Sequence, residues 1–206
     1  MTEPDVAITD FLLTLEAALF SLLLWRSGYA GSDLRIPFVV FFGATAAAAL
    51  TGGLVHGFFA GSTSGAGVVL WRISLLALGL VALATWAIGA RLILTTSAAR
   101  VVQMAAVAIT IGYAAIVVAV NDSFWVAIAD YLPATLFLFV AFAIVHQRNQ
   151  LPTLPGLLGL ALTLVAAFVQ QQRIALHPVY FNHNALYHAI QAVGLFLIFR
   201  SAREIV

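Results

Sequence analysis

The sequence predicts an all-α polytopic membrane protein, folded as one bundle of seven transmembrane helices. Of its 206 residues, 63% are hydrophobic and only 8% are charged, whereas a soluble domain carries roughly 25% charged residues. The apolar residues fall into successive runs, most of them close to the roughly 20 residues that a helix needs to cross a bilayer. Only short polar segments separate these runs, so residues 1–206 are expected to form a single domain.

The apolar runs define the expected helices in order. No positive segment precedes the first run and no cleavage site follows it, so we expect it to stay as a helix rather than act as a signal peptide. The fourth and fifth runs are separated only by a tight turn at Asn121-Asp122, and the sixth run is the shortest. The expected helices cover residues 7–25, 36–60, 68–93, 99–120, 123–145, 154–171 and 184–201.

The residue types that are missing exclude several kinds of chemistry. The chain has no cysteine, which excludes disulfides, thiolate metal sites and cysteine nucleophiles. It also has no lysine, which excludes a retinal Schiff base despite the count of seven helices. The net charge of +1 gives no reason to expect binding to nucleic acid.

The arginines predict the orientation, because positively charged flanks stay in the cytoplasm. Only Arg72 and Arg173 flank the runs on one side. The bias predicts an N-terminus outside the cell and a C-terminus in the cytoplasm. The seven arginines on the other side are Arg26, Arg35, Arg91, Arg100, Arg148, Arg200 and Arg203.

Polar residues are concentrated at the outer ends of the expected helices. With the N-terminus outside, early positions in odd-numbered helices share a depth with late positions in even-numbered ones. At 1.5 Å per residue, this depth is about 5–10 Å below the outer surface. A polar pocket that faces outward accounts for this arrangement. The residues concerned are Asp10, His56, Arg72, Asp130 and His188, with Gln170, Gln171, Gln172, His177 and His183 in the same region.

His56 and His188 are the primary candidates for a metal site. Each lies in an apolar run, where an unpaired polar group costs several kcal/mol, and imidazoles from separate helices near an acid form a ligand set for zinc. The third ligand is either His183 or Asn184, with His177 as a further candidate. Asn184 shares a helical face with His188, whereas His183 reaches the site only if it precedes the helix. The alternatives are that each histidine satisfies a buried hydrogen bond, or that His56 and His188 hold a haem.

Glu16, Asp130 and Arg72 are the expected catalytic residues. Glu16 lies near the middle of the first helix, so it has to be protonated, paired or associated with a metal. Asp130 has no partner nearby in the sequence. Arg72 either turns inward, to pair with Glu16 or hold an oxyanion or anionic head group, or extends to the surface. Asp10 has a simpler interpretation, as a charge favoured by the dipole at a helix N-terminus.

Two stretches resemble motifs of the CREST-type superfamily of seven-helix membrane hydrolases, which contains the alkaline ceramidases and the progestin and adipoQ receptors. Leu54–Phe58, with His56, stands where that superfamily has a histidine at the end of helix 2. Asn184–His188 stands where it has a His-x-x-x-His pair at the start of helix 7. The resemblance implies zinc and lipid hydrolysis. Gly52 occupies the place of the superfamily's serine, however, and Asn184 that of its first paired histidine.

The same regions also resemble a family of uncharacterised bacterial membrane proteins. The shared patterns are Gly-Gly-x-x-His-Gly and Asn-His-Asn-x-Leu-Tyr-His, found here at Gly52–Gly57 and Asn182–His188. This resemblance implies location in the bacterial inner membrane and implies no activity.

The leading hypothesis from the sequence is a zinc-dependent hydrolase that acts on a lipid amide or ester. A metal on His56, His188 and either His183 or Asn184 would activate a bound water. The alternative is a non-enzymatic receptor, carrier or complex subunit that binds a membrane lipid or small ligand in the same pocket. The exchanges at Gly52 and Asn184 favour this alternative.

Overall fold

The computed structural model describes residues 1–27, 32–61, 64–149 and 151–206. Within these ranges, seven helices are long and apolar enough to cross a membrane. The described part of the chain contains no β-strand, only an isolated bridge between His177 and Phe181. The helices are α1 (Pro4–Arg26), α2 (Arg35–Leu54), α3 (Gly65–Ile93), α4 (Thr96–Ala119), α5 (Phe124–Gln147), α6 (Leu154–Gln171) and α7 (His183–Ile205), with a π-helical turn, η1 (Val55–Phe59), after α2.

The expected helical class and the seven apolar spans are confirmed. The tight turn at Asn121-Asp122 is also confirmed, because α4 ends at Ala119 and α5 begins at Phe124. The second span differs from the expectation of one regular helix over residues 36–60. Its last turn, Val55–Phe59, is a π-helix, and a single π-turn inside a helix is frequent at functional sites.

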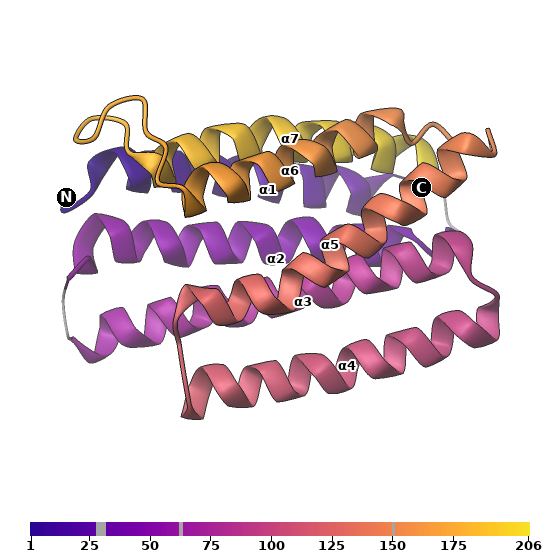
Figure 1. Ribbon diagram of the computed structural model, residues 1–206, viewed down its shortest axis with the longest axis horizontal. Coiled ribbons are helices and arrows are strands. Elements are labelled where there is room, and N and C mark those ends of the chain that lie inside the picture. Colours follow the sequence, from indigo (N-terminus) through magenta and orange to yellow (C-terminus); the bar gives the residue numbers. More distant parts are fainter. Residues whose placement is uncertain (28–31, 62–63, 150) are drawn as a thin grey trace.

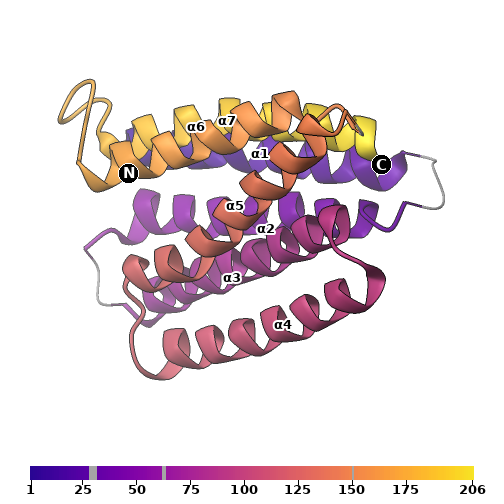
Figure 2. The same cartoon turned by 45° about the vertical axis from the view of Figure 1, so that its right-hand side comes forward.

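Six of the described helices form a ring, and α4 lies outside it. Around the ring, α1 packs on α2, α2 on α3, α3 on α5, α5 on α6, α6 on α7, and α7 on α1. Helix α4 packs mainly against α3, and both views place it at the edge of the bundle farthest from α6 and α7 (Figures 1 and 2). Helix α5 crosses the bundle obliquely in both views. Of the neighbouring pairs in the ring, α5 and α6 have the least contact.

The end of the ring near the C-terminus holds a packed aromatic core. Phe20 of α1 stacks on Phe199 of α7, with ring centroids 4.1 Å apart, and meets Phe42 of α2 edge-on at 5.6 Å. Phe42 is fully buried, and Phe199 is almost so. Edge-on and stacked aromatic pairs add to the free energy gained by burying their area. This core joins α1, α2 and α7 at one end of the bundle.

Glycines allow two helix pairs to approach closely. A Cβ atom at Gly194 of α7 would lie 2.9 Å from the carbonyl oxygen of Gly159 in α6. In α2, a Cβ atom at Gly53 would lie 2.9 Å from Cβ of Asp10. Small residues at such crossings let two backbones pack in direct contact. The second crossing brings Asp10 against the last turn of α2, just before the turn that carries His56.

The two termini lie at opposite ends of the bundle (Figures 1 and 2). The N-terminus shares its end with η1 and with the connection from α6 to α7. The helix bounds place Arg72 and Arg173 toward this end and the other seven arginines toward the opposite one.

Candidate functional site

The π-helical turn η1 places His56 beside the N-terminal segment. The backbone N–H groups of Thr2 and Glu3 donate to the carbonyl oxygens of Gly57 and His56, at 3.0 and 3.1 Å. The Glu3 carboxylate lies 2.5 Å from Nδ1 of His56. The terminal turn of a helix leaves carbonyl groups without partners inside the helix, and the first residues of the chain satisfy two of them here.

Asn182 caps α7 and connects it to α1. Its side-chain oxygen accepts hydrogen bonds from the backbone N–H groups of Asn184 and Ala185, at 2.9 and 3.1 Å. Its own N–H donates to the Asp5 carboxylate at 2.9 Å. An asparagine at this position satisfies donors that the helix itself cannot. The cap sets the first turn of α7 and therefore the direction in which His188 points.

His188 and Asp10 form a buried pair between α7 and α1. Nε2 of His188 lies 3.2 Å from Oδ1 of Asp10, and the two side chains are 11% and 5% exposed. On the other side of the imidazole ring, Nδ1 lies 3.1 Å from the hydroxyl oxygen of Thr9. Both ring nitrogens therefore have a partner within the protein, which fixes the orientation of the ring.

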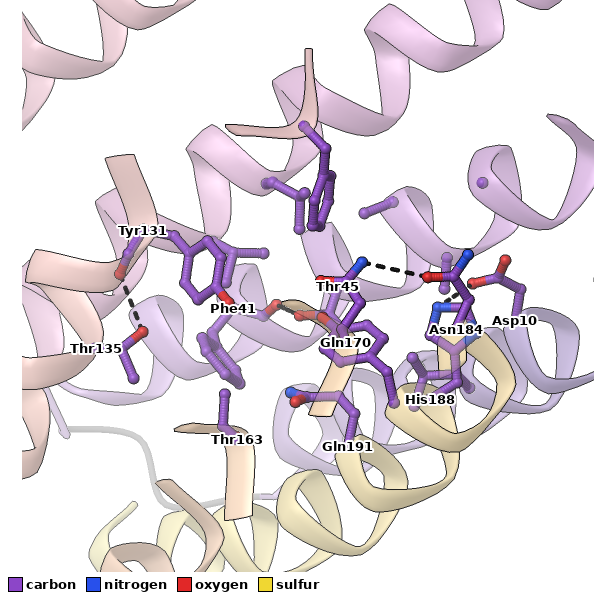
Figure 3. A pocket seen from close by; sticks show the side chains of 18 of the residues that line it. Asp10, Phe41, Thr45, Tyr131, Thr135, Thr163, Gln170, Asn184, His188 and Gln191 are labelled. Carbon is purple, nitrogen blue, oxygen red and sulfur yellow. Dashed lines mark hydrogen bonds and ion pairs between the residues drawn. The ribbon is translucent and has the colours of Figure 1, made fainter. Parts of the chain in front are cut away.

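This pair stands at one end of a cavity of about 280 Å³ that is lined by the helices of the ring. Figure 3 shows Asp10, His188 and Asn184 together on one side of the cavity, and Tyr131 and Thr135 on the opposite side. None of the described residues of α4 line the cavity. The labelled lining residues are Asp10, Phe41, Thr45, Tyr131, Thr135, Thr163, Gln170, Asn184, His188 and Gln191.

Two buried oxygen atoms of the lining lack a hydrogen-bond partner. They are Oδ2 of Asp10 and Oε1 of Gln191, and these residues are 3% and 9% exposed. Buried polar groups nearly always have a partner, because leaving one unsatisfied costs about 1–3 kcal/mol. Both residues line the same cavity, so a molecule inside it can supply the missing partners.

The structure brings His56 and His188, whose depths were predicted to match, to one cavity, and Asn184 lines the same cavity. The side-chain oxygen of Asn184 accepts a hydrogen bond from Gln170 at 3.4 Å. His183 does not line the cavity. Because α7 already begins at His183, this residue is helical, and the non-helical segment that would have let it reach the site is absent.

The three expected catalytic residues lie outside the cavity lining. Nε of Arg72 pairs with the Asp122 carboxylate at 3.0 Å rather than turning toward Glu16. Glu16 is partly exposed on the flank of α1. Asp130 is also partly exposed, although its Oδ2 is buried without a hydrogen-bond partner. Asp10, rather than Glu16 or Asp130, is the acid that contacts His188.

No three histidine, aspartate or glutamate side chains in the described ranges gather into a group that could hold a metal ion. His188 has both ring nitrogens engaged, and Nδ1 of His56 is engaged by Glu3. In this arrangement the residues do not fit a metal, and the zinc site stays a prediction. His177 belongs to the connection before α7, where its Nδ1 accepts backbone hydrogen bonds from Val179 and Tyr180.

Sequence reasoning missed Thr9, Glu3 and Gln191 as parts of the site. Gln191 had a detectable signal, because it follows His188 by three positions and Asn184 by seven, which is the spacing of one helical face. Asp10 had a weaker signal, since its position seven residues into α1 is too deep for a first-turn charge. Nothing in the sequence indicates that Glu3 folds back onto His56.

Residues 6–206 match the profile of a family of unknown function, DUF6962. The chain belongs to this family. The match includes every helix from α2 to α7 and most of α1, with Asp10, His56 and His188 inside it. No curated protein and no solved structure matches the chain.

Proposed function

We propose that this protein binds a small amphipathic ligand or membrane lipid inside its helix ring, without chemical conversion. The observation that carries the proposal is the cavity with two unpartnered buried oxygens, on Asp10 and Gln191. Ligand pockets combine a mostly apolar lining with a few polar groups that fix orientation. Here apolar side chains such as Leu13, Leu78 and Ile198 accompany that polar end.

The order of Thr9, His188 and Asp10 also argues for binding rather than for acyl transfer. In a catalytic triad the hydroxyl faces the substrate and the acid lies behind the histidine. Here the acid lines the cavity, while Thr9 does not and its hydroxyl lies within hydrogen-bond distance of backbone carbonyl oxygens of its own helix, of which Val6 is the nearer at 2.9 Å. This arrangement can hold a ligand but offers no nucleophile to it.

In the orientation that we propose, the polar end of the cavity faces away from the cytoplasm. Seven of nine arginines flank the opposite end of the bundle, and such flanks stay cytoplasmic. The N-terminus would then be outside and the C-terminus in the cytoplasm. The resemblance to bacterial membrane proteins supports the bacterial inner membrane as the location.

A metal-dependent lipid hydrolase of the CREST type is the second candidate. The observation in its favour is that His56, His188 and Asp10 all line one end of the same cavity. Metal chemistry there would require His188 to release Asp10 and Thr9. The metal would then have to supply the free energy that these two contacts now contribute to holding the histidine.

Elemental analysis combined with ligand binding separates the two candidates. If the protein is a binding protein, the detergent-purified chain holds no stoichiometric metal, lipids raise its melting temperature, and a chelator leaves that rise unchanged. Near one zinc per chain, lost in both His56→Ala and His188→Ala and accompanied by hydrolysis of a lipid, would contradict the binding proposal and support the hydrolase.

A further inference from the structure

We infer that the ligand of this cavity is a single-chain amphiphile with a protonated amine as its head group. The inference rests on the proposed binding function and specifies the ligand class. It starts from the charge of the lining. Among the described lining residues, Asp10 is the one acid; its Oδ1 faces His188, its Oδ2 has no partner, and no arginine lines the cavity. Arg72, which directly follows the lining residue Trp71, is held by Asp122. An anionic head group would therefore meet a carboxylate in a setting of low dielectric constant, where like charges repel strongly.

The hydroxyl groups of the lining also favour a ligand whose head group donates hydrogen bonds. Thr45, Thr85, Thr135 and Thr163 line the cavity, and each donates its proton to a carbonyl oxygen four residues earlier in its own helix, at 2.7, 2.7, 3.0 and 3.1 Å. A hydroxyl whose proton is engaged in this way presents only lone pairs to a ligand. With the unpartnered Oδ2 of Asp10, the cavity offers acceptors on several helices.

Aromatic rings at the same end suit a cation in particular. Trp71, Phe124 and Tyr187 line the cavity. The indole N–H of Trp71 donates to the Asp122 carbonyl at 2.7 Å, which holds the ring in place, and its centroid lies 6.2 Å from that of Phe124. The ring of Tyr187 lies 5.1 Å from that of His188. Ammonium groups bind favourably over such rings, most strongly where water is excluded. A neutral hydroxyl head group would gain little from them.

The shape of the cavity limits the tail to one chain. Its lining follows α7 from His188 to Ile198, which is about 15 Å at 1.5 Å per residue. That length is about half of the roughly 30 Å hydrocarbon core of a bilayer, the depth of one leaflet. The volume of about 280 Å³ lies at the lower limit of the roughly 300–1,000 Å³ of small-molecule pockets. A cavity of this size and length suits a single hydrocarbon chain.

The test compares three probes that share a dodecyl chain and differ in the head group: dodecylamine, dodecanol and laurate. Binding of each to the full chain in non-ionic detergent at neutral pH is measured by calorimetry and by the shift in melting temperature. We expect dodecylamine to bind roughly tenfold tighter than dodecanol, because a hydrogen bond to a charged group is stronger than a neutral one. We expect laurate to bind weakest.

Two variants test whether the charge of Asp10 causes the preference for the amine. Asp10→Asn keeps an acceptor for His188 but removes the charge, so the affinities for dodecylamine and dodecanol should become similar. Glu16→Gln removes a carboxylate outside the cavity and should leave the tenfold preference intact. The wild-type comparison remains decisive if Asp10→Asn does not fold.

The outcomes separate this inference from the proposed function. If dodecanol or laurate binds wild type as tightly as dodecylamine, or if Asp10→Asn keeps the preference, the amine head group is wrong while ligand binding stands. If no probe binds, the inference is overturned, and the shift in melting temperature with membrane lipids decides separately whether the proposed function stands.

Discussion

Asp10 and His188 are the residues on which the site depends. Taking a carboxylate out of water costs several kcal/mol unless it is paired, and this one is paired through a single oxygen. Gly53 leaves room for the Asp10 side chain in the interior, because a Cβ atom at Gly53 would lie only 2.9 Å from Cβ of Asp10. The pair orients the histidine but leaves one carboxylate oxygen unsatisfied in the cavity.

We predict strong coupling between these two residues. His188→Leu removes the partner of a buried acid and should lower the free energy of unfolding by about 3–5 kcal/mol. The double variant Asp10→Asn/His188→Leu contains no unpaired buried charge at this site. Its loss in free energy of unfolding should therefore be much smaller than the sum of the losses in the two single variants. Unfolding in mixed detergent micelles measures each value. As a control, Glu16→Gln should be additive with His188→Leu, and additivity for the Asp10 pair as well would show that the contact contributes little.

At the scale of single elements, two features of the helices control the site: the cap of α7 and the glycine crossing of α6 with α7. The cap determines where α7 begins, and the crossing fixes its distance from α6. Both depend on one or two residues each, so both can be tested by single substitutions.

Asn182→Ala removes the cap and should destabilise the protein by about 1 kcal/mol, since an alanine cannot accept from the first N–H groups of the helix. Asn182→Asp keeps the acceptor and should retain most of the stability. Thermal unfolding of the three proteins measures the difference. Equal loss in both variants would contradict a role for the side-chain cap, because the contact with Asp5 uses the backbone N–H of residue 182, which both variants keep.

Gly159→Ala should lower the stability by about 1–3 kcal/mol, because its methyl group would overlap the backbone of Gly194 in α7. The matched control is Gly112→Ala in α4, where the added methyl group meets nothing within 4 Å. That change should be neutral or stabilise the helix by up to about 1 kcal/mol. Similar effects at the two positions would argue against tight packing of α6 on α7.

The helices were predictable from the sequence because each is a long apolar run with polar ends, and the expected range 154–171 coincides with α6. The order of the helices in the ring was not, since it depends on which small residues meet, such as Gly159 with Gly194. The site was predictable in part. The depth of His56 and His188 follows from counting residues, whereas the fold-back of Glu3 and the choice of Asp10 over Glu16 depend on tertiary contacts.

At the scale of the whole molecule, a ring of six helices lines the cavity and α4 stands outside. This division assigns different roles to the helices. The ring supplies the lining and the buried pair, and α4 covers α3 and contributes nothing to the lining among the described residues. Substitutions on the outer face of α4 should therefore leave ligand binding unchanged.

The absence of cysteine from the chain allows a direct test of its orientation. Leu176→Cys lies at the N-terminal end of the bundle, and Ser97→Cys lies at the opposite end; both positions are exposed. In intact spheroplasts, a membrane-impermeant maleimide should label Leu176→Cys only, and Ser97→Cys should react after permeabilisation. The reverse pattern would place the polar end of the cavity in the cytoplasm.

The most direct test of the central claim is native mass spectrometry of the protein released from detergent. It compares wild type with a variant in which a larger side chain fills the cavity. Ala48 lines the cavity and is 7% exposed, so Ala48→Phe should occupy the space of the ligand, whereas Ala105→Phe adds the same ring to the exposed face of α4. The account predicts one bound amphiphile on wild type and on Ala105→Phe, and none on a folded Ala48→Phe. Equal occupancy of all three proteins would contradict it, because the ligand would then bind elsewhere.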